Sequence, residues 1–154
     1  MATLYSNQKT KWSQNVPSEK IDTNELAGRV RVAFADITLA SAAISDVIEL
    51  VNLPNGARII DGYLTNAALG ASTTLSVGYA AYKNASGTTV SASAAAYLAA
   101  TSTSSAARTD IFATIALGAG SVVNANEDGL PITATLAGGT ASGVVQIAIR
   151  YVVD

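Results

Sequence analysis

The sequence has neither cysteine nor histidine among its 154 residues. Without cysteine it forms no disulfide and no zinc–thiolate site, and it has no thiol nucleophile. Without histidine it lacks the commonest general base, which excludes Ser–His–Asp and Cys–His catalytic arrangements. Any catalysis would therefore have to rest on carboxylate side chains.

Three carboxylates are candidates for catalytic groups. Asp46 and Glu49 lie three residues apart, which places them on opposite faces of a strand, and Asp61 is the third candidate. A glycosidase-type pair needs a fixed separation across a sugar-sized cleft, and no pattern in the sequence indicates such a cleft. We therefore expect no enzymatic activity and no bound cofactor.

One segment, Asn124–Gly129, partly matches the spacing of a calcium-binding loop. The twelfth position of such a loop carries a bidentate glutamate, but Thr135 stands there, and no flanking helices are indicated. A plain turn is the better interpretation, so we expect no metal site. The glycine-rich patterns that bind phosphates do not occur either.

Charge is scarce in this chain. Charged residues make up 13% of it, about half of the usual share, and the mean hydropathy is +0.33. A soluble monomer normally exposes more charge, so these values favour a surface partly covered by other chains, including a homo-oligomer of two or three copies. The alternative is a sandwich rich in Ala, Ser and Thr that is simply weakly charged.

Neither a nucleic acid nor a membrane is an expected partner. The net charge of −2 creates no global field that would attract phosphates or acidic lipids. The charge-free windows are interrupted by Thr, Ser and Gly, unlike membrane helices, and the N-terminus lacks the apolar region of a signal peptide. Basic and acidic residues are mixed near the N-terminus, and we expect the basic ones to pair with acidic residues of a partner protein.

Residues 1–27 differ from the rest of the chain. They are polar and show no helical or strand period, which predicts an extended N-terminal arm beside a β-sandwich domain over residues 28–154. The arm is either a disordered tail or a segment that orders against a neighbouring subunit. In the second case aromatic anchors and basic residues would bind the partner: Tyr5, Lys9, Lys11, Trp12, Arg29 and Arg31.

From Arg29 onward the hydrophobic pattern has period two, which predicts about eight strands separated by turns that contain Gly or Asn. The densest part, Asp46–Ala80, predicts a meander of three strands with tight turns at residues 54–56 and 70–72. Residues 83–107 predict a long surface connection with a short helix or irregular lid at residues 94–100. The fold class is therefore all-β, an antiparallel two-sheet sandwich that is jelly-roll-like.

Several segments carry a resemblance to a known group of proteins. In order they are NELAGRVRV (24–32), DVIEL (46–50), LPNGARIIDG (53–62), YLAA (97–100) and YVVD (151–154). Together they resemble the small structural proteins of tailed bacteriophages that decorate or cement the capsid. The resemblance implies a β-rich protein made in the bacterial cytoplasm and placed on the outer surface of the phage head. There it would bridge neighbouring subunits of the major capsid protein.

Two functions remain open from the sequence. The first is the non-enzymatic capsid decoration that the resemblance implies. The second is a carbohydrate-binding or host-adhesion module, as found in fibre and surface proteins. That second function needs exposed aromatic rings with Asn or Asp beside them, and four tyrosines are available for it: Tyr63, Tyr79, Tyr82 and Tyr97.

Overall fold

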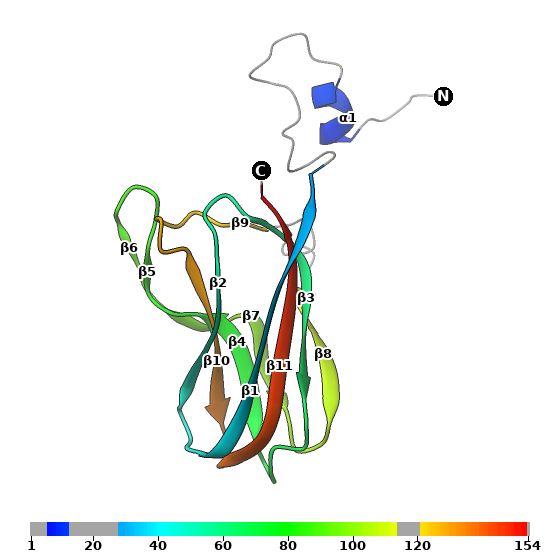
Figure 1. Cartoon of the computed structure of the whole chain (residues 1–154), viewed down its shortest axis with the longest axis vertical. Coiled ribbons are helices and arrows are strands. Elements are labelled where there is room, and N and C mark those ends of the chain that lie inside the picture. Colours follow the sequence, from blue (N-terminus) through cyan, green and yellow to red (C-terminus); the bar gives the residue numbers. More distant parts are fainter. Residues whose placement is uncertain (1–5, 13–27, 114–120, 154) are drawn as a thin grey trace.

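The computed structural model describes residues 6–12, 28–113 and 121–153. Within them eight strands of five or more residues form two antiparallel sheets (Figure 1). These strands are β1 (Val30–Ala42), β2 (Val47–Leu53), β3 (Arg58–Asn66), β4 (Thr74–Tyr79), β7 (Ser93–Ser102), β8 (Ala107–Ile111), β10 (Leu130–Ala137) and β11 (Ala141–Val152). Three two-residue strands complete the set: β5 (Tyr82–Lys83), β6 (Thr89–Val90) and β9 (Ser121–Val122).

The strand order is that of a jelly roll. One sheet runs β1-β11-β3-β8, with β9 also paired to β3, and the other runs β2-β10-β4-β7. All pairings are antiparallel, and most connections between successive long strands cross from one sheet to the other. This interleaving is the double Greek key of a jelly roll, so the predicted fold class is confirmed. The alternating pattern at residues 108–117 predicts one of the eight strands, which the structure shows as β8 over its first part; residues 114–120 lie outside the described part.

The predicted meander over Asp46–Ala80 is wrong in its pairing. Strands β2, β3 and β4 occur where the pattern placed them, but β2 and β4 flank β10 in one sheet, while β3 lies between β11 and β8 in the other. The turn at residues 54–56 carries the chain between sheets, and the Gly56 N–H donates to the distant Val123 carbonyl over 2.9 Å. A turn sequence predicts a reversal of the chain, but the hydrogen-bonding partners come from strands far away in sequence.

The predicted long connection at residues 83–107 is also wrong. It holds the β5–β6 hairpin, the ten-residue strand β7, and the start of β8; β7 replaces the expected helix or lid. The Ala-rich run has good helix formers, but β7 completes the edge of a sheet against β4, and this tertiary pairing overrides local propensity. Small side chains suit the close approach of these strands, where Gly78 lies against the backbone of Ser93.

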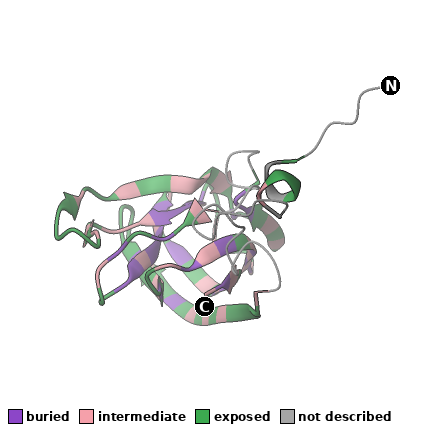
Figure 2. Cartoon of the chain, turned by 90° about the horizontal axis from the view of Figure 1, so that it is seen from above, coloured by how far each residue is buried: buried purple, intermediate pink, exposed green. Residues whose placement is uncertain are grey.

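The core lies between the sheets and consists of aliphatic side chains, as Figure 2 shows by the buried positions on the inward faces of both layers. In β11 the inward residues Val145, Ile147 and Ile149 are fully buried, and Leu75 and Ile132 oppose them from the other sheet. Each fully buried aliphatic side chain contributes roughly 1.5–3 kcal/mol of transfer free energy. The core holds both sheets rigidly and thereby fixes what their outer faces present.

A short helix, α1 (Asn7–Trp12), occupies part of the predicted extended arm. The side chain of Ser6 caps it, because its Oγ accepts a hydrogen bond of 3.2 Å from the Lys9 N–H. Lys9 and Lys11 in the last turn also suit the negative end of the helix dipole. For residues 7–12 the expectation of an extended conformation is therefore wrong; Tyr5 and residues 13–27 lie outside the described residues.

Candidate partner-binding surface

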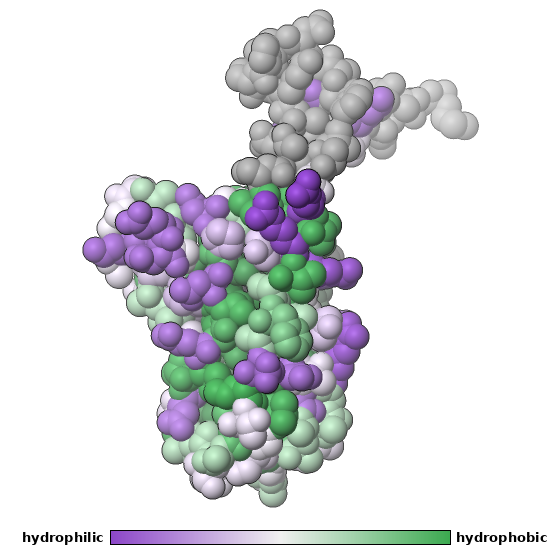
Figure 3. Space-filling model, in the orientation of Figure 1, coloured by the Kyte–Doolittle hydropathy of each residue, from purple (hydrophilic) through white to green (hydrophobic). Residues whose placement is uncertain are grey.

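The outer side of β1 exposes three large apolar side chains in succession. Val30, Val32 and Phe34 are 54%, 60% and 59% exposed, while the alternate residues Ala33 and Ala35 face the core. In Figure 3 hydrophobic surface follows the path of β1 in Figure 1. Because β1 ends its sheet and pairs only with β11, this strip lies at an edge. Three adjacent exposed apolar side chains on one strand indicate a contact surface.

The strip belongs to a wider outer face formed by β1, β11, β3 and β8. On this face the Arg150 guanidinium, on β11, makes a bidentate ion pair with the Asp61 carboxylate on β3; the Nε···Oδ1 distance is 2.6 Å. The hydrogen bond and the negative charge of Asp61 raise the pKa of Arg150. On β8 the Arg108 guanidinium lies 3.7 Å from the centre of the Tyr63 ring, in a cation–π contact. Charged and aromatic groups therefore alternate across this face.

A hollow of about 400 Å³ opens on the same face. Tyr63, Arg108 and Arg150 line it together with Ile111 and Phe112 at the end of β8. Asp61 and Asp110 line it as well, so charged groups surround the hollow, which lies toward the β8 edge of the sheet, away from β1. One edge of the face thus protrudes with apolar side chains, and the other edge is hollowed.

The residues predicted from sequence as partner-binding fall in two places. Lys9, Lys11 and the backbone of Trp12 lie on α1; Arg29 precedes β1, and Arg31 lies within it. Both arginines are exposed, but Arg31 alternates with Val30 and Val32 and lies on the side of β1 that also carries Ala33 and Ala35, opposite the apolar strip. Tyr5 lies outside the described residues.

Sequence reasoning missed the apolar strip of β1 and the arginine of β8 as surface features. The alternation of Val30, Val32 and Phe34 was visible, but alternation alone does not say which face turns inward. The signal that distinguishes the faces is the small size of Ala33 and Ala35, because small side chains fit beneath an edge strand where the two sheets converge. That signal is weak without knowing that β1 is an edge strand.

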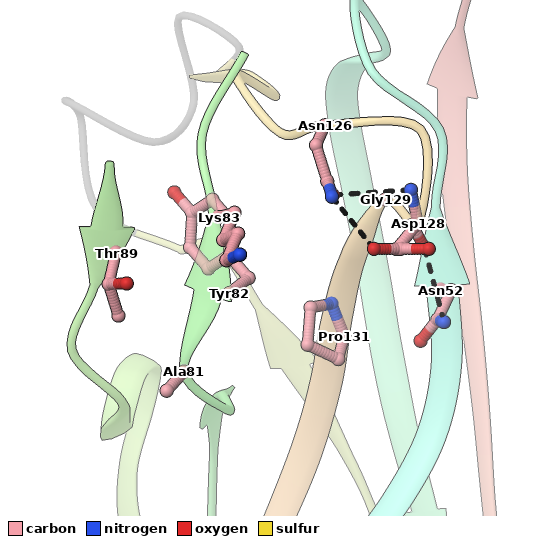
Figure 4. Close-up of a pocket in the computed structure, with 9 residues that line it drawn as sticks. All are labelled: Asn52, Ala81, Tyr82, Lys83, Thr89, Asn126, Asp128, Gly129 and Pro131. Atoms are coloured by element: carbon pink, nitrogen blue, oxygen red, sulfur yellow. Dashed lines mark hydrogen bonds between the residues drawn. The ribbon is translucent and has the colours of Figure 1, made fainter. Parts of the chain in front are cut away.

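A second hollow, of about 430 Å³, lies at the end of the sandwich between the β5–β6 hairpin and the loop before β10 (Figure 4). Tyr82 and Lys83 line one side, and Asn52, Asn126 and Asp128 line the other. The Asn126 Nδ2 donates to the Asp128 carboxylate over 2.7 Å, and the Asp128 N–H donates to the Asn126 Oδ1 over 3.2 Å. These bonds, with the Gly129 N–H donating to the Asn126 carbonyl over 3.1 Å, close a turn at residues 126–129.

The tyrosines considered for sugar binding pack mainly against one another. The Tyr79 ring lies 5.6 Å from Tyr82 and 5.8 Å from Tyr97, and Tyr97 lies 4.7 Å from Phe112. Burial, and then the neighbouring Tyr79 and Tyr82, raise the pKa of Tyr97. Tyr63 is covered by Arg108. Of these rings, Tyr82 is the one that lines the second hollow.

Residues 6–12, 28–113 and 121–153 contain no group of three Asp or Glu side chains placed to hold a metal ion. Within the same part of the chain, no helix is long and apolar enough to cross a membrane.

The strand order and the two packed sheets define a jelly-roll domain. Chains of three phage capsid structures share this fold. A chain in the capsid of Ralstonia phage GP4 is 24% identical, with a TM-score of 0.62 over 82% of this chain and 86% of that chain. A chain in the cyanophage Pam1 capsid asymmetric unit is 20% identical, with a TM-score of 0.55 over 82% and 86%.

A chain in the acidic stable capsid structure of Helicobacter pylori bacteriophage KHP30 is 17% identical, with a TM-score of 0.51 over 80% of this chain and 87% of that chain. No protein-family model matches the chain, and no curated protein matches it either. Structural similarity at these levels of sequence identity establishes the fold of this chain. The resemblance to phage structural proteins noted from the sequence is confirmed at that level, since all three structures are phage capsids.

Proposed function

We propose that this chain is a non-enzymatic structural protein of a phage virion. The observation that carries the proposal is the shared fold: it extends over at least 80% of this chain and 86% of each capsid chain. Most of this chain therefore corresponds to most of each capsid chain. The scarcity of charge in the sequence and the exposed apolar strip of β1 agree with a surface that is covered in an assembly.

Within the virion we assign it the role of a decoration protein on the outer surface of the capsid. It would bridge subunits of the major capsid protein, with the sandwich as the rigid body and residues 1–27 as the attachment. Two features support this division of labour. The arm carries the basic residues Lys9 and Lys11, and Arg29 and Arg31 lie where the arm joins the sandwich. Capsid attachment would therefore be concentrated at one end of the molecule.

The test uses purified phage and heads prepared without this protein. The proposal predicts that the full chain is present in virions in many copies and that it binds to heads that lack it. Electron microscopy of the reconstituted heads should then show added density on the outside of the shell. Absence from purified virions, or added density on the inner surface, would refute the decoration role.

A second function, binding of cell-surface glycans, is favoured by one observation. The hollow of Figure 4 sets Tyr82 opposite Asn126 and Asp128, an aromatic ring facing amide and carboxylate groups. Such a combination suits the apolar face and the hydroxyls of a sugar. A glycan array tests this function: signals that the Tyr82→Ala variant loses would support it, and an array without signals above background would remove it.

A further inference from the structure

We propose that the outer face of the β1-β11-β3-β8 sheet binds a second copy of this chain, through a two-fold axis that runs parallel to the strands between β11 and β3. The inference deepens the self-association expected of a bridging protein, but it concerns the isolated protein and does not depend on the virion role. It follows from the way in which side chains on this face complement each other across its midline.

The first complementary pair is Asp36 and Arg108. Strand register places both on one row of the sheet: Asp36 of β1 lies beside Gln146, Gln146 beside Thr65, and Thr65 beside Arg108 of β8. Both charged side chains are exposed. Three strand spacings, about 14 Å, separate them within one chain, so they do not pair there. Opposite charges thus lie on the same row at the two sides of the face.

A two-fold axis along the midline exchanges β1 with β8 and β11 with β3. Each copy then presents its Asp36 to the Arg108 of the other copy, and the pair forms twice. An interface between identical copies must be self-complementary in this way, with residue i meeting residue j and j meeting i. The same operation sets Gln146 against Thr65 of the second copy, which is a polar pair able to hydrogen-bond.

The neighbouring rows obey the same exchange. Arg150 is placed opposite Asp61 of the second copy, so that the two intramolecular ion pairs come together as a cluster with alternating signs. On the next row Tyr63 is placed opposite Ala148, and the exposed Phe34 is placed opposite Asp110 of the second copy. Opposite charges are therefore matched on the rows of Asp36 and Arg150, and the row between them sets an aromatic ring beside a carboxylate.

The shape of the face supports the same arrangement. The exposed side chains of Val32 and Phe34 protrude from β1, and the hollow lined by Arg108, Asp110, Ile111 and Phe112 lies at the β8 side. The two-fold exchange brings the strip of each copy to the hollow of the other. Aligned packing of sheets at about −30° and about 10 Å is the ordinary geometry of such a contact. Because the axis is parallel to the strands, the first residues of β1 in the two copies lie at the same end of the dimer.

Charge reversal tests the proposal with the full-length protein in solution. Sedimentation velocity over a range of concentrations should show a dimer for the unchanged protein. Asp36→Arg alone and Arg108→Asp alone should each weaken dimerisation by about tenfold or more, because each creates two like-charge contacts. The double variant Asp36→Arg/Arg108→Asp should regain the dimer, since both pairs are again opposite in sign.

Mixing the two single variants gives the sharpest result. In a mixed dimer both contacts pair opposite charges, so native mass spectrometry should show heterodimers in excess over either homodimer. Glu49→Arg and Lys83→Asp, reversals of exposed charges away from this face, serve as controls and should leave the dimer unchanged. A monomer or a trimer for the unchanged protein, single reversals without effect, or a mixture without heterodimers would each overturn the proposal. None of these outcomes bears on whether the chain is found in virions.

Discussion

The hydroxyl of Thr103 donates a hydrogen bond of 3.0 Å to the hydroxyl of Thr73, and both side chains are buried in the core. The Thr73 hydroxyl in turn donates to the Gly70 carbonyl over 2.8 Å. This chain of bonds ties the connection before β4 to the end of β7, at the end of the sandwich opposite the start of β1 (Figure 1).

The order of donation predicts unequal effects for two isosteric substitutions. Thr73→Val removes the acceptor of Thr103 and the donor to Gly70, and it should lower the free energy of unfolding by about 1–3 kcal/mol. Thr103→Val removes one donor and leaves the bond from Thr73 to Gly70, so it should cost about 1 kcal/mol or less. Urea denaturation of both variants and of the double variant measures this. Equal losses in the two single variants would contradict the assigned order.

Gly78 should tolerate no side chain. A Cβ on Gly78 would lie 1.8 Å from the Ser93 carbonyl oxygen, so alanine must push β4 and β7 apart. We expect Gly78→Ala to lower the free energy of unfolding by about 3 kcal/mol or more. Gly56→Ala is the matched control, because Gly56 has a positive φ of 76° but nothing within 4 Å of a Cβ; its cost should be about 1 kcal/mol. A thermal melt that ranks Gly56→Ala as the more harmful change would contradict the close approach of these strands.

Alkaline pH should destabilise the protein through Tyr97. Burial, followed by the nearby Tyr79 and Tyr82, raises the pKa of Tyr97 in the folded state above its unfolded value of about 10. Below pH 10 both states keep the proton and stability is complete. Above it the unfolded state loses the proton first, so stability falls as pH rises, by at most about 1.4 kcal/mol per pH unit for one group.

The melting temperature followed by circular dichroism between pH 8 and pH 11 should show this loss. In Tyr97→Phe the loss should be smaller, while stability at pH 8 stays close to that of the unchanged protein. If Tyr97→Phe falls as steeply as the unchanged protein above pH 10, another group causes the alkaline loss.

Removal of residues 1–27 should separate folding from attachment. The sandwich core consists of residues from β1 onward, so the truncated chain should melt within a few degrees of the full chain. Its binding to undecorated phage heads should be abolished, because the proposed attachment has been removed. Calorimetry and head-pelleting assays measure the two properties. A large drop in melting temperature would show instead that the arm belongs to the core.

The lysines of α1 should act through charge. Lys9→Ala together with Lys11→Ala should weaken binding to heads several-fold at low salt, and binding of this double variant should depend less on salt than that of the unchanged chain. Lys83→Ala, in the β5–β6 hairpin away from the arm, is the control and should bind normally. Equal salt dependence for the double variant and the unchanged chain would rule out an electrostatic role for α1.

The sequence was a good guide to where strands lie and a poor guide to what they pair with. Alternation in β11, with Val145, Ile147 and Ile149 on one side, identified that strand and its buried face directly. The Ala-rich run that became β7 had no such alternation of large side chains, and its strand conformation arises from pairing with β4. The local sequence pattern shows at which interval buried side chains recur along a strand. Which strands pair depends on segments more than 50 residues apart in the sequence, as for β3 and β11.

The candidate site was predicted only in part for the same reason. Arg29 and Arg31 are predicted from the sequence to bind a partner, and the structure shows both exposed, with Arg31 on the side of β1 opposite the apolar strip. Phe34 was visible in the sequence, but a single aromatic residue in an alternating strand is normally buried. Its exposure follows from the position of β1 at a sheet edge.

By itself the sequence determined which chemistry is missing and which segments extend into strands. Residue types and local period carry that information without any folding. Only the tertiary structure decided which strands are neighbours, and so it alone brought Asp36 and Arg108 onto one row of one face. The physical reason is that strand pairing is set by long-range hydrogen bonding and by the common core. A row of side chains across a sheet exists only once β1, β11, β3 and β8 lie side by side.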